Sequence, residues 1–115
     1  MEIKLSKNDK DIYLMELSGS LDLFSSNQLK DLIMQMVGKK VEHFIINLKN
    51  VDKINSSGIG ALVYVSSTMK KISCPLIIIA PKGPVLHALE VTRLKGYFTI
   101  VSNLNEAISQ VGSEL

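Results

Sequence analysis

Two spacings of apolar residues divide this chain into predicted strands and predicted helices. EIKLS and IYLMEL are short alternating or apolar runs on either side of the polar segment KNDKD, which predicts an antiparallel hairpin. The run SSNQLKDLIMQMVGKK has a helical apolar stripe, with Ser25 or Ser26 placed to cap its start and Gly38 its end. The stripe is formed by Leu29, Leu32, Ile33, Met36 and Val37.

Strand and helix patterns continue to alternate to the end of the chain. HFIINL is a continuous apolar run typical of a covered strand, and LIIIA and YFTIV predict two more strands. A third helix is expected from Pro84 to a stop near Gly96, and a last one after Asn103, where Glu106 completes a capping-box pattern. The helix after HFIINL is indicated by the period of Ile59, Leu62, Val63, Ser66 and Met69.

This order of elements predicts an α/β fold. We expect a mixed, mostly parallel sheet of about five strands, with an antiparallel hairpin at the N-terminus and about four flanking helices. A chain of 115 residues is long enough for one core but not for two, so residues 1–115 are predicted to form a single domain. Binding residues of such sheets collect beyond the carboxyl ends of the strands, here in SGSLDLFSS and KNVDKINSSG.

Composition and charge narrow the class of protein. The net charge of +2 is too small for a nucleic-acid binder, and no apolar run approaches the roughly 18 residues of a membrane span. The first residues have no apolar segment after their charges, so no secretion signal is expected. With Cys74 as its one cysteine, the chain cannot form an internal disulfide. We expect a cytoplasmic protein that neither enters a membrane nor binds nucleic acid directly.

The segment INSSGIGALV carries the candidate chemistry, and most catalytic interpretations of it fail. SSGIG lacks the length and the lysine of a phosphate-binding loop. A serine nucleophile needs a histidine base, and the spacing of His43 and His87 connects neither to the serines. Together with Cys74 they also lack metal-ligand spacing. We therefore expect no enzyme, no metal and no cofactor, with a nucleotide-binding or hydrolysing domain as an alternative.

The two serines of this segment stand where a strand gives way to a helix. One of them is expected to cap the helix, whose first amides have no partners within it. The next residues, Gly58, Ile59 and Gly60, include no acid that would oppose the partial positive charge of the helix N-terminus. We expect both glycines to keep the approach to the hydroxyls clear. Such an end suits phosphorylation and contact with a partner.

These residues also carry a family resemblance. NLKNVDKINSSGIGAL resembles the signature of the STAS-domain anti-sigma factor antagonist family, also called anti-anti-sigma factors. LSGSLDLFSSNQLKDLI resembles the upstream Gly-x-Leu-Asp segment and first helix of that family, and PVLHALEVTRL its third helix. The resemblance covers nearly the whole chain. It implies a single STAS domain over residues 1–115, with a mixed sheet flanked by helices.

The resemblance also implies roles for particular residues. Ser56 matches the serine that the family's partner phosphorylates, and Ser57 matches the adjacent position, which is not the usual acceptor. Asp22 matches an acid that lies near this site in relatives, although it also suits a turn or a helix cap. Asn55 stands in place of the usual acid, where it can still accept a capping hydrogen bond, and Arg93 stands where relatives often have glycine. The implied partner-binding residues are Asp22, Asn55, Ser56, Ser57, Gly58, Ile59 and Gly60.

The family's function would follow from these roles. The unphosphorylated form would bind an anti-sigma factor that is also a serine kinase and free a sigma factor. Phosphorylation of Ser56 would abolish binding, and a serine phosphatase would restore it. ATP and magnesium would belong to the kinase. Asn55 keeps an alternative open, in which the chain is a docking subunit of a lipid-transport ABC system and is not phosphorylated.

Overall fold

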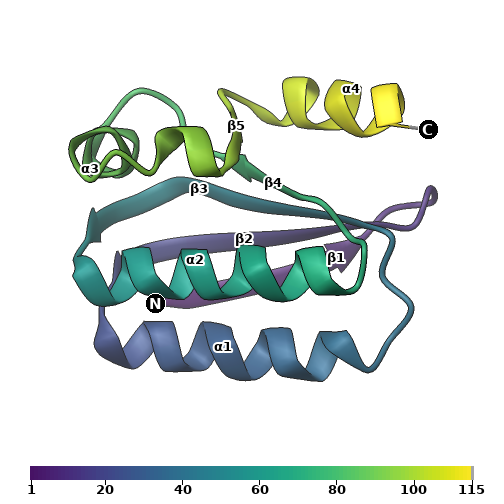
Figure 1. The fold of residues 1–115 in the computed structure, drawn as a ribbon, viewed down its shortest axis with the longest axis horizontal. Helices are drawn as coiled ribbons and strands as arrows, with labels where there is room; N and C mark the ends of the chain where they lie inside the picture. Colours follow the sequence, from purple (N-terminus) through teal and green to yellow (C-terminus); the bar gives the residue numbers. More distant parts are fainter. Residues whose placement is uncertain (115) are drawn as a thin grey trace.

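The computed structural model describes residues 1–114, which fold as one sheet with helices on both faces (Figure 1). The chain alternates strands and helices in the predicted order, apart from one added 3₁₀ turn. The elements are β1 (Glu2–Lys7), β2 (Ile12–Leu21), α1 (Leu23–Val37), β3 (His43–Ile54), α2 (Ser56–Lys71), β4 (Leu76–Ile79), α3 (Pro84–Val91), η1 (Lys95–Tyr97), β5 (Thr99–Val101) and α4 (Leu104–Glu114).

The five strands lie in sequence order, β1-β2-β3-β4-β5. β1 pairs with β2 antiparallel, and every other neighbouring pair is parallel. The predicted fold class, a mixed and mostly parallel sheet that begins with an antiparallel hairpin, is therefore confirmed. Parallel pairing places the carboxyl ends of β2 and β3 at the same edge of the sheet, and the register pairs Leu21 with Ile54 at that edge.

Each face of the sheet has its own core. α1 and α2 lie side by side on one face, and α4 lies on the other (Figure 1). The larger core includes Met15, Phe44 and Ile46 from the strands together with the stripe residues Leu29 and Ile33 of α1. α3 contributes to the same core and packs beside β3, beyond the end of the shorter β4. The core under α4 consists of Ile12, Ile45, Ile77, Ile79, Ala107 and Val111.

The start of α1 differs from the prediction. The capping residue is Asp22 and the helix begins at Leu23, so neither Ser25 nor Ser26 is the cap. The Ser25 amide donates to Asp22 Oδ1 at 3.1 Å, and the Asp22 amide donates to Ser25 Oγ at 2.8 Å. This reciprocal pair is a capping box, in which serine replaces the more common Glu or Gln. Gly38 is the C-cap, as predicted.

The end of α3 also differs from the prediction. The helix stops at Val91, and Gly96, the expected stop, lies within the 3₁₀ turn instead. Arg93 has a left-handed backbone with φ of 61°, and this turns the chain away from the helix axis. The last helix begins as expected, because the Glu106 amide donates to Asn103 Oδ1 at 2.9 Å.

Among the described residues, no helix combines the length and the apolar character that a membrane span requires.

Candidate functional site

Two strand ends bring the predicted site residues together. Leu21 and Ile54 are partners in the parallel pairing of β2 and β3, so the residues that follow them, Asp22 and Asn55, come next to each other at the edge of the sheet. The Asn55 amide donates to the Leu21 carbonyl oxygen at 3.3 Å, which joins the two segments. Both loops singled out by the sequence therefore form one surface, and the N-termini of α1 and α2 meet there.

Asp22 is the cap of α1 and carries an ionised carboxylate. Its backbone is extended, with φ of −114°, and its side chain is exposed. The hydrogen bond from the Ser25 amide, followed by that from the Ser25 hydroxyl, lowers the pKa of Asp22 below its ordinary value. The sequence left open whether this residue is a cap or part of the loop site. It is the cap, and its position places it in the loop surface as well.

Asn55 plays the same part at α2. Its backbone is extended, with φ of −111°, and its Oδ1 atom accepts from the Gly58 amide at 3.1 Å. The expectation that a serine caps this helix is wrong, since Ser56 and Ser57 are the first two helical residues. The Asn55 side chain accepts the capping hydrogen bond, which leaves the hydroxyls for other uses. Ser56 is exposed and Ser57 is half-buried.

The two glycines of the motif have different roles. Gly58 is buried, and a Cβ atom there would lie 2.5 Å from the Leu21 carbonyl oxygen and 2.9 Å from Ile54 Cγ1. No side chain fits, because the first turn of α2 packs directly against the ends of β2 and β3. Gly60 has no atom within 4 Å of such a Cβ. The expectation that both glycines clear the approach to the serines is therefore wrong for Gly58, which serves packing, and for Gly60 it stays a prediction.

The charges around Ser56 favour an anion at this helix end. The first turn of α2 contains no acidic residue, and its cap is the neutral amide of Asn55. The partial positive charge of the helix N-terminus is therefore unopposed within the element. Lys53, one residue before the end of β3, is also exposed. The two loops also provide two carboxylates at this edge, those of Asp22 and Asp52.

A cavity of about 520 Å³ opens between these loops and the start of α3. Pro84, the first residue of α3, closes one side of it, which the sequence did not predict. It can do so because α3 packs beside the carboxyl half of β3. The lining consists of Ser20, Leu21, Asp22, Asp52, Lys53, Ile54, Asn55 and Pro84.

Two exposed apolar side chains adjoin the site and were missed in the sequence. Leu23 and Phe24 form the first turn of α1, directly after Asp22, and are 64% and 74% exposed. Because the helix was expected to begin at Ser25 or Ser26, both residues fell in the preceding loop. Large exposed apolar side chains next to polar loops are typical of contact surfaces between proteins. Their adjacency to the Asp22 acid was the available signal.

Among the described residues, no hydrogen bond joins either histidine to Ser56 or Ser57. His43 begins β3 and Ser56 follows its end, so the full strand separates them. His87 lies exposed on α3, and Cys74 is buried after α2. Within residues 1–114, no group of three or more potential metal-ligating side chains comes together.

Comparison with known proteins identifies the family. A model of the STAS domain matches residues 4–107, and the chain belongs to the STAS domain family. Among solved structures, an anti-sigma factor antagonist from Mycobacterium paratuberculosis is similar, with a TM-score of 0.85 and 19% identity over 96% of this chain and 92% of that chain.

Three further structures share this fold. SpoIIAA, an anti-sigma factor antagonist, in its unphosphorylated form has a TM-score of 0.74 and 20% identity, over 96% of this chain and 97% of that chain. The phosphorylated form of SpoIIAA, from Bacillus, has a TM-score of 0.72, with 19% identity over 96% of this chain and 99% of that chain. A sulfate transporter family protein from Wolinella succinogenes has a TM-score of 0.75 and 16% identity, over 84% of this chain and 81% of that chain.

Proposed function

We propose that this protein is an anti-sigma factor antagonist that works by partner switching. In its unphosphorylated form it binds an anti-sigma factor that is also a serine kinase, and a sigma factor is thereby released. Phosphorylation of Ser56 abolishes this binding, and a serine phosphatase restores it. The observation that carries the proposal is the exposed Ser56 at the first position of α2, within the signature segment of a STAS domain.

Ser56 is better suited than Ser57 to accept a phosphate. Among the described residues, no hydrogen bond engages the Ser56 hydroxyl, and the side chain is exposed, whereas Ser57 is half-buried. A kinase must reach the acceptor oxygen with its own ATP and magnesium, so exposure favours the first serine. In this proposal the protein itself is not an enzyme and carries no cofactor.

The charges at the site indicate where the inhibition acts. A phosphate on Ser56 adds about −1.5 to −2 charges at the N-terminus of α2, where the unpaired amides favour an anion. The fold can therefore keep its conformation after modification. The new charge instead opposes the partner, through repulsion and the cost of removing its water. A loss of about 3 to 4 kcal/mol lowers affinity several hundredfold, which is enough for a switch.

Phosphate mapping tests the acceptor. The protein is incubated with ATP, magnesium and each anti-sigma kinase encoded in the same genome, and the modified peptide is sequenced by mass spectrometry. We expect one phosphate on Ser56, none in Ser56→Ala, and unchanged modification in the matched control Ser57→Ala. Phosphate on Ser57, or its persistence in Ser56→Ala, would contradict the assignment.

Partner binding tests the electrostatic mechanism. Ser56→Asp places a negative charge at the same position, so we expect the anti-sigma factor to bind it at least about a hundredfold more weakly than the unmodified protein. Thermal unfolding of this variant should show no loss of stability, because a negative charge at a helix N-terminus is favourable. Equal affinity of the variant and the wild type would exclude repulsion as the cause.

Asn55 favours a second candidate, in which the chain docks on an ABC transporter for lipids and is never phosphorylated. Asn55 replaces the usual acid beside the acceptor, so a charge that a kinase could recognise is absent. Capture of partners from the native cells on the immobilised protein separates the two functions. An anti-sigma kinase supports partner switching, whereas a transporter ATPase, without modification at either serine, supports docking.

A further inference from the structure

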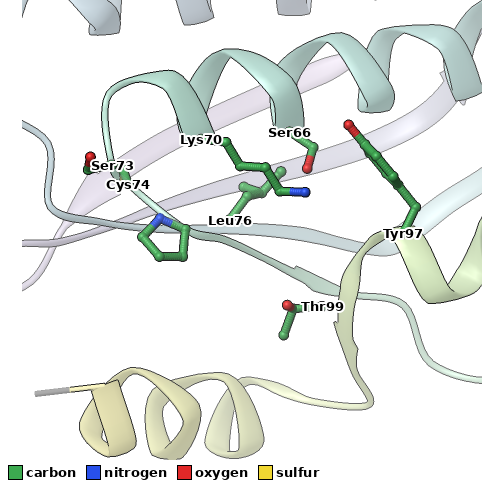
Figure 2. Close-up of a pocket in the computed structure, with 8 residues that line it drawn as sticks. Ser66, Lys70, Ser73, Cys74, Leu76, Tyr97 and Thr99 are labelled. Atoms are coloured by element: carbon green, nitrogen blue, oxygen red, sulfur yellow. The ribbon is translucent and has the colours of Figure 1, made fainter.

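A second cavity lies at the opposite end of α2 from Ser56. It has a volume of about 380 Å³ and opens between the last turns of α2, the start of β4, the 3₁₀ turn and the start of β5 (Figure 2). Neither the family motifs nor the proposed switch involves it. Six of its lining residues are Ser66, Lys70, Cys74, Leu76, Tyr97 and Thr99.

A serine hydroxyl with no hydrogen-bond partner among the described residues points into this cavity. Ser66 is only 4% exposed, and its hydroxyl is directed from α2 toward the middle of the cavity (Figure 2). No hydrogen bond to another described residue satisfies it. A hydroxyl both donates and accepts hydrogen bonds. Ser66 is therefore available to an occupant of the cavity that can hydrogen-bond.

A single cation stands one helical turn further along. Lys70 follows Ser66 by four residues, and its side chain extends over the same cavity (Figure 2). None of the three ion pairs among residues 1–114 includes Lys70, and no acidic residue lines the cavity. The ammonium lies 4.6 Å from the centre of the Tyr97 ring. The cavity thus holds one positive charge that no carboxylate neutralises.

Part of the remaining lining is apolar and held in place, beside the polar residues Ser73 and Thr99. Leu76 and Cys74 are buried at 7% and 0% exposure, and they form the floor toward the sheet. The ring of Tyr97 forms the opposite wall, and its hydroxyl lies 2.9 Å from Ser67 Oγ, which fixes the ring against α2. Tyr97 also packs edge-to-face on Phe98, with ring centroids 5.1 Å apart. The cavity therefore has a polar end, at Lys70 and Ser66, and an apolar part, at Leu76 and the Tyr97 ring.

We propose that this cavity binds a small monocarboxylate with an apolar tail. The carboxylate would accept hydrogen bonds from Lys70 Nζ and Ser66 Oγ, and the tail would lie between Leu76 and the Tyr97 ring. One lysine balances one negative charge, whereas phosphate sites use several charged or backbone donors. The volume is at the lower end of small-molecule sites, which accords with a short tail.

Binding is tested by NMR on the complete ¹⁵N-labelled protein. Sodium octanoate is titrated below its micelle-forming concentration, and 1-octanol serves as the uncharged probe. We expect octanoate to shift the amide signals of Ser66, Lys70, Leu76 and Tyr97 in a saturable way, and octanol to bind about tenfold more weakly. Signals around Ser56 should not move, because that site lies at the other end of the helix.

Two neighbouring lysines provide a matched pair of variants. Lys70→Met keeps the apolar stem but removes the charge, and we expect it to weaken octanoate binding about tenfold or more while leaving octanol binding within about twofold. Lys71→Met, on a residue that does not line the cavity, should leave both unchanged. Ser66→Ala should weaken octanoate about threefold or more. Thermal unfolding of each variant checks that it is folded.

Three outcomes would overturn the proposal. The first is the absence of saturable shifts around the cavity at millimolar octanoate. The second is an equal loss of binding in Lys71→Met and Lys70→Met. The third is stronger Lys70-dependent binding of inorganic phosphate than of octanoate, which would assign the cavity to another class of anion.

Discussion

Two glycines in the first turns of α2 are two residues apart and have opposite surroundings. Gly58 touches the ends of both β2 and β3, and an added Cβ would come within 2.5 Å of a backbone oxygen that cannot move without disturbing the sheet. Gly60 faces open space. The close approach at Gly58 holds the N-terminus of α2 against Leu21, so it also sets the distance between Asn55 and Asp22.

Alanine substitutions should separate these two roles. Gly58→Ala overpacks the junction, and we expect a loss of about 1 to 3 kcal/mol in the free energy of unfolding. Gly60→Ala should instead stabilise the protein by up to about 1 kcal/mol, because alanine favours the helix and meets no neighbour. Urea unfolding followed by circular dichroism measures both. A neutral effect of Gly58→Ala would show that the junction can open without cost.

Asp22 makes the stability of the protein depend on pH. Its pKa is lowered in the folded state, chiefly by the hydrogen bond from the Ser25 amide. A carboxyl group of this kind stabilises the fold above its unfolded pKa of about 3.9, and the contribution is lost as pH falls through the lower, folded value. Asp22→Asn keeps a capping oxygen but has no charge to lose.

The wild type should therefore be more stable than Asp22→Asn at pH 7. The difference in melting temperature should shrink below about pH 5 and disappear once Asp22 is protonated in the folded protein. Thermal unfolding across this range, together with an NMR titration of the Asp22 carboxyl, measures the effect. A difference that stays constant from pH 7 into the acid range would show that the charge makes no contribution.

At the scale of elements, α2 and α3 end in the same way with non-glycine residues. Ser73 and Arg93 both have left-handed backbones, with φ of 59° and 61°. After α3, the Leu94 amide donates to the Leu89 carbonyl at 3.0 Å and the Arg93 amide to the Glu90 carbonyl at 3.1 Å. These bonds form a Schellman motif, whose left-handed position usually holds glycine. Arg93 therefore places a Cβ atom in the left-handed region at this turn, at a conformational cost that glycine would avoid.

Arg93→Gly should stabilise the protein by roughly 1 kcal/mol, because glycine adopts the left-handed conformation without the clash of a Cβ atom. Arg93→Ala is the matched control. It removes the same side chain but keeps the Cβ, so it should give no comparable gain. Chemical denaturation compares the three proteins. Equal stabilisation by both substitutions would mean that the arginine side chain, and not the backbone, causes the strain.

At the scale of the whole molecule, the residues most protected from solvent lie in the middle of the sheet. β3 is paired on both sides and covered on both faces, and residues Phe44–Ile46 are fully buried. β1 is an edge strand whose residues are mostly exposed. α4 packs on β3, β4 and β5, so it leaves the hairpin face uncovered (Figure 1).

Hydrogen exchange should follow this arrangement. We expect the amides of Phe44, Ile45 and Ile46 to exchange only through global unfolding, and those of Ile3 and Leu5 in β1 to exchange faster through local opening. NMR-detected exchange at several denaturant concentrations distinguishes the two routes. Amides of β1 that are as protected as those of β3 would show that the hairpin and the sheet open as one unit.

The local spacing of apolar residues was enough to predict the order of the elements and the buried face of α1. Leu29 and Ile33 lie on one side of a helix wherever that helix packs, so their burial could be read without knowing the neighbour. The motif around Ser56 was also local, and the expectation that Asn55 accepts a capping hydrogen bond was confirmed. The exact capping residues were harder to predict. Asp22, Ser25 and Ser26 all have side-chain oxygens that can cap a helix, and only the path of the backbone determines which of them does so.

Contacts between distant residues could not be read in this way. The reason that Gly58 must be glycine lies in Leu21, on another strand, and the wall of the second cavity depends on Tyr97 meeting Ser67, thirty residues away. Such contacts produce no periodic pattern in the sequence, because the distance between the two residues is set by how the sheet twists and how the helices pack on it. The pattern thus specified which faces are buried, while the packing of α2 on the sheet specified which atoms meet.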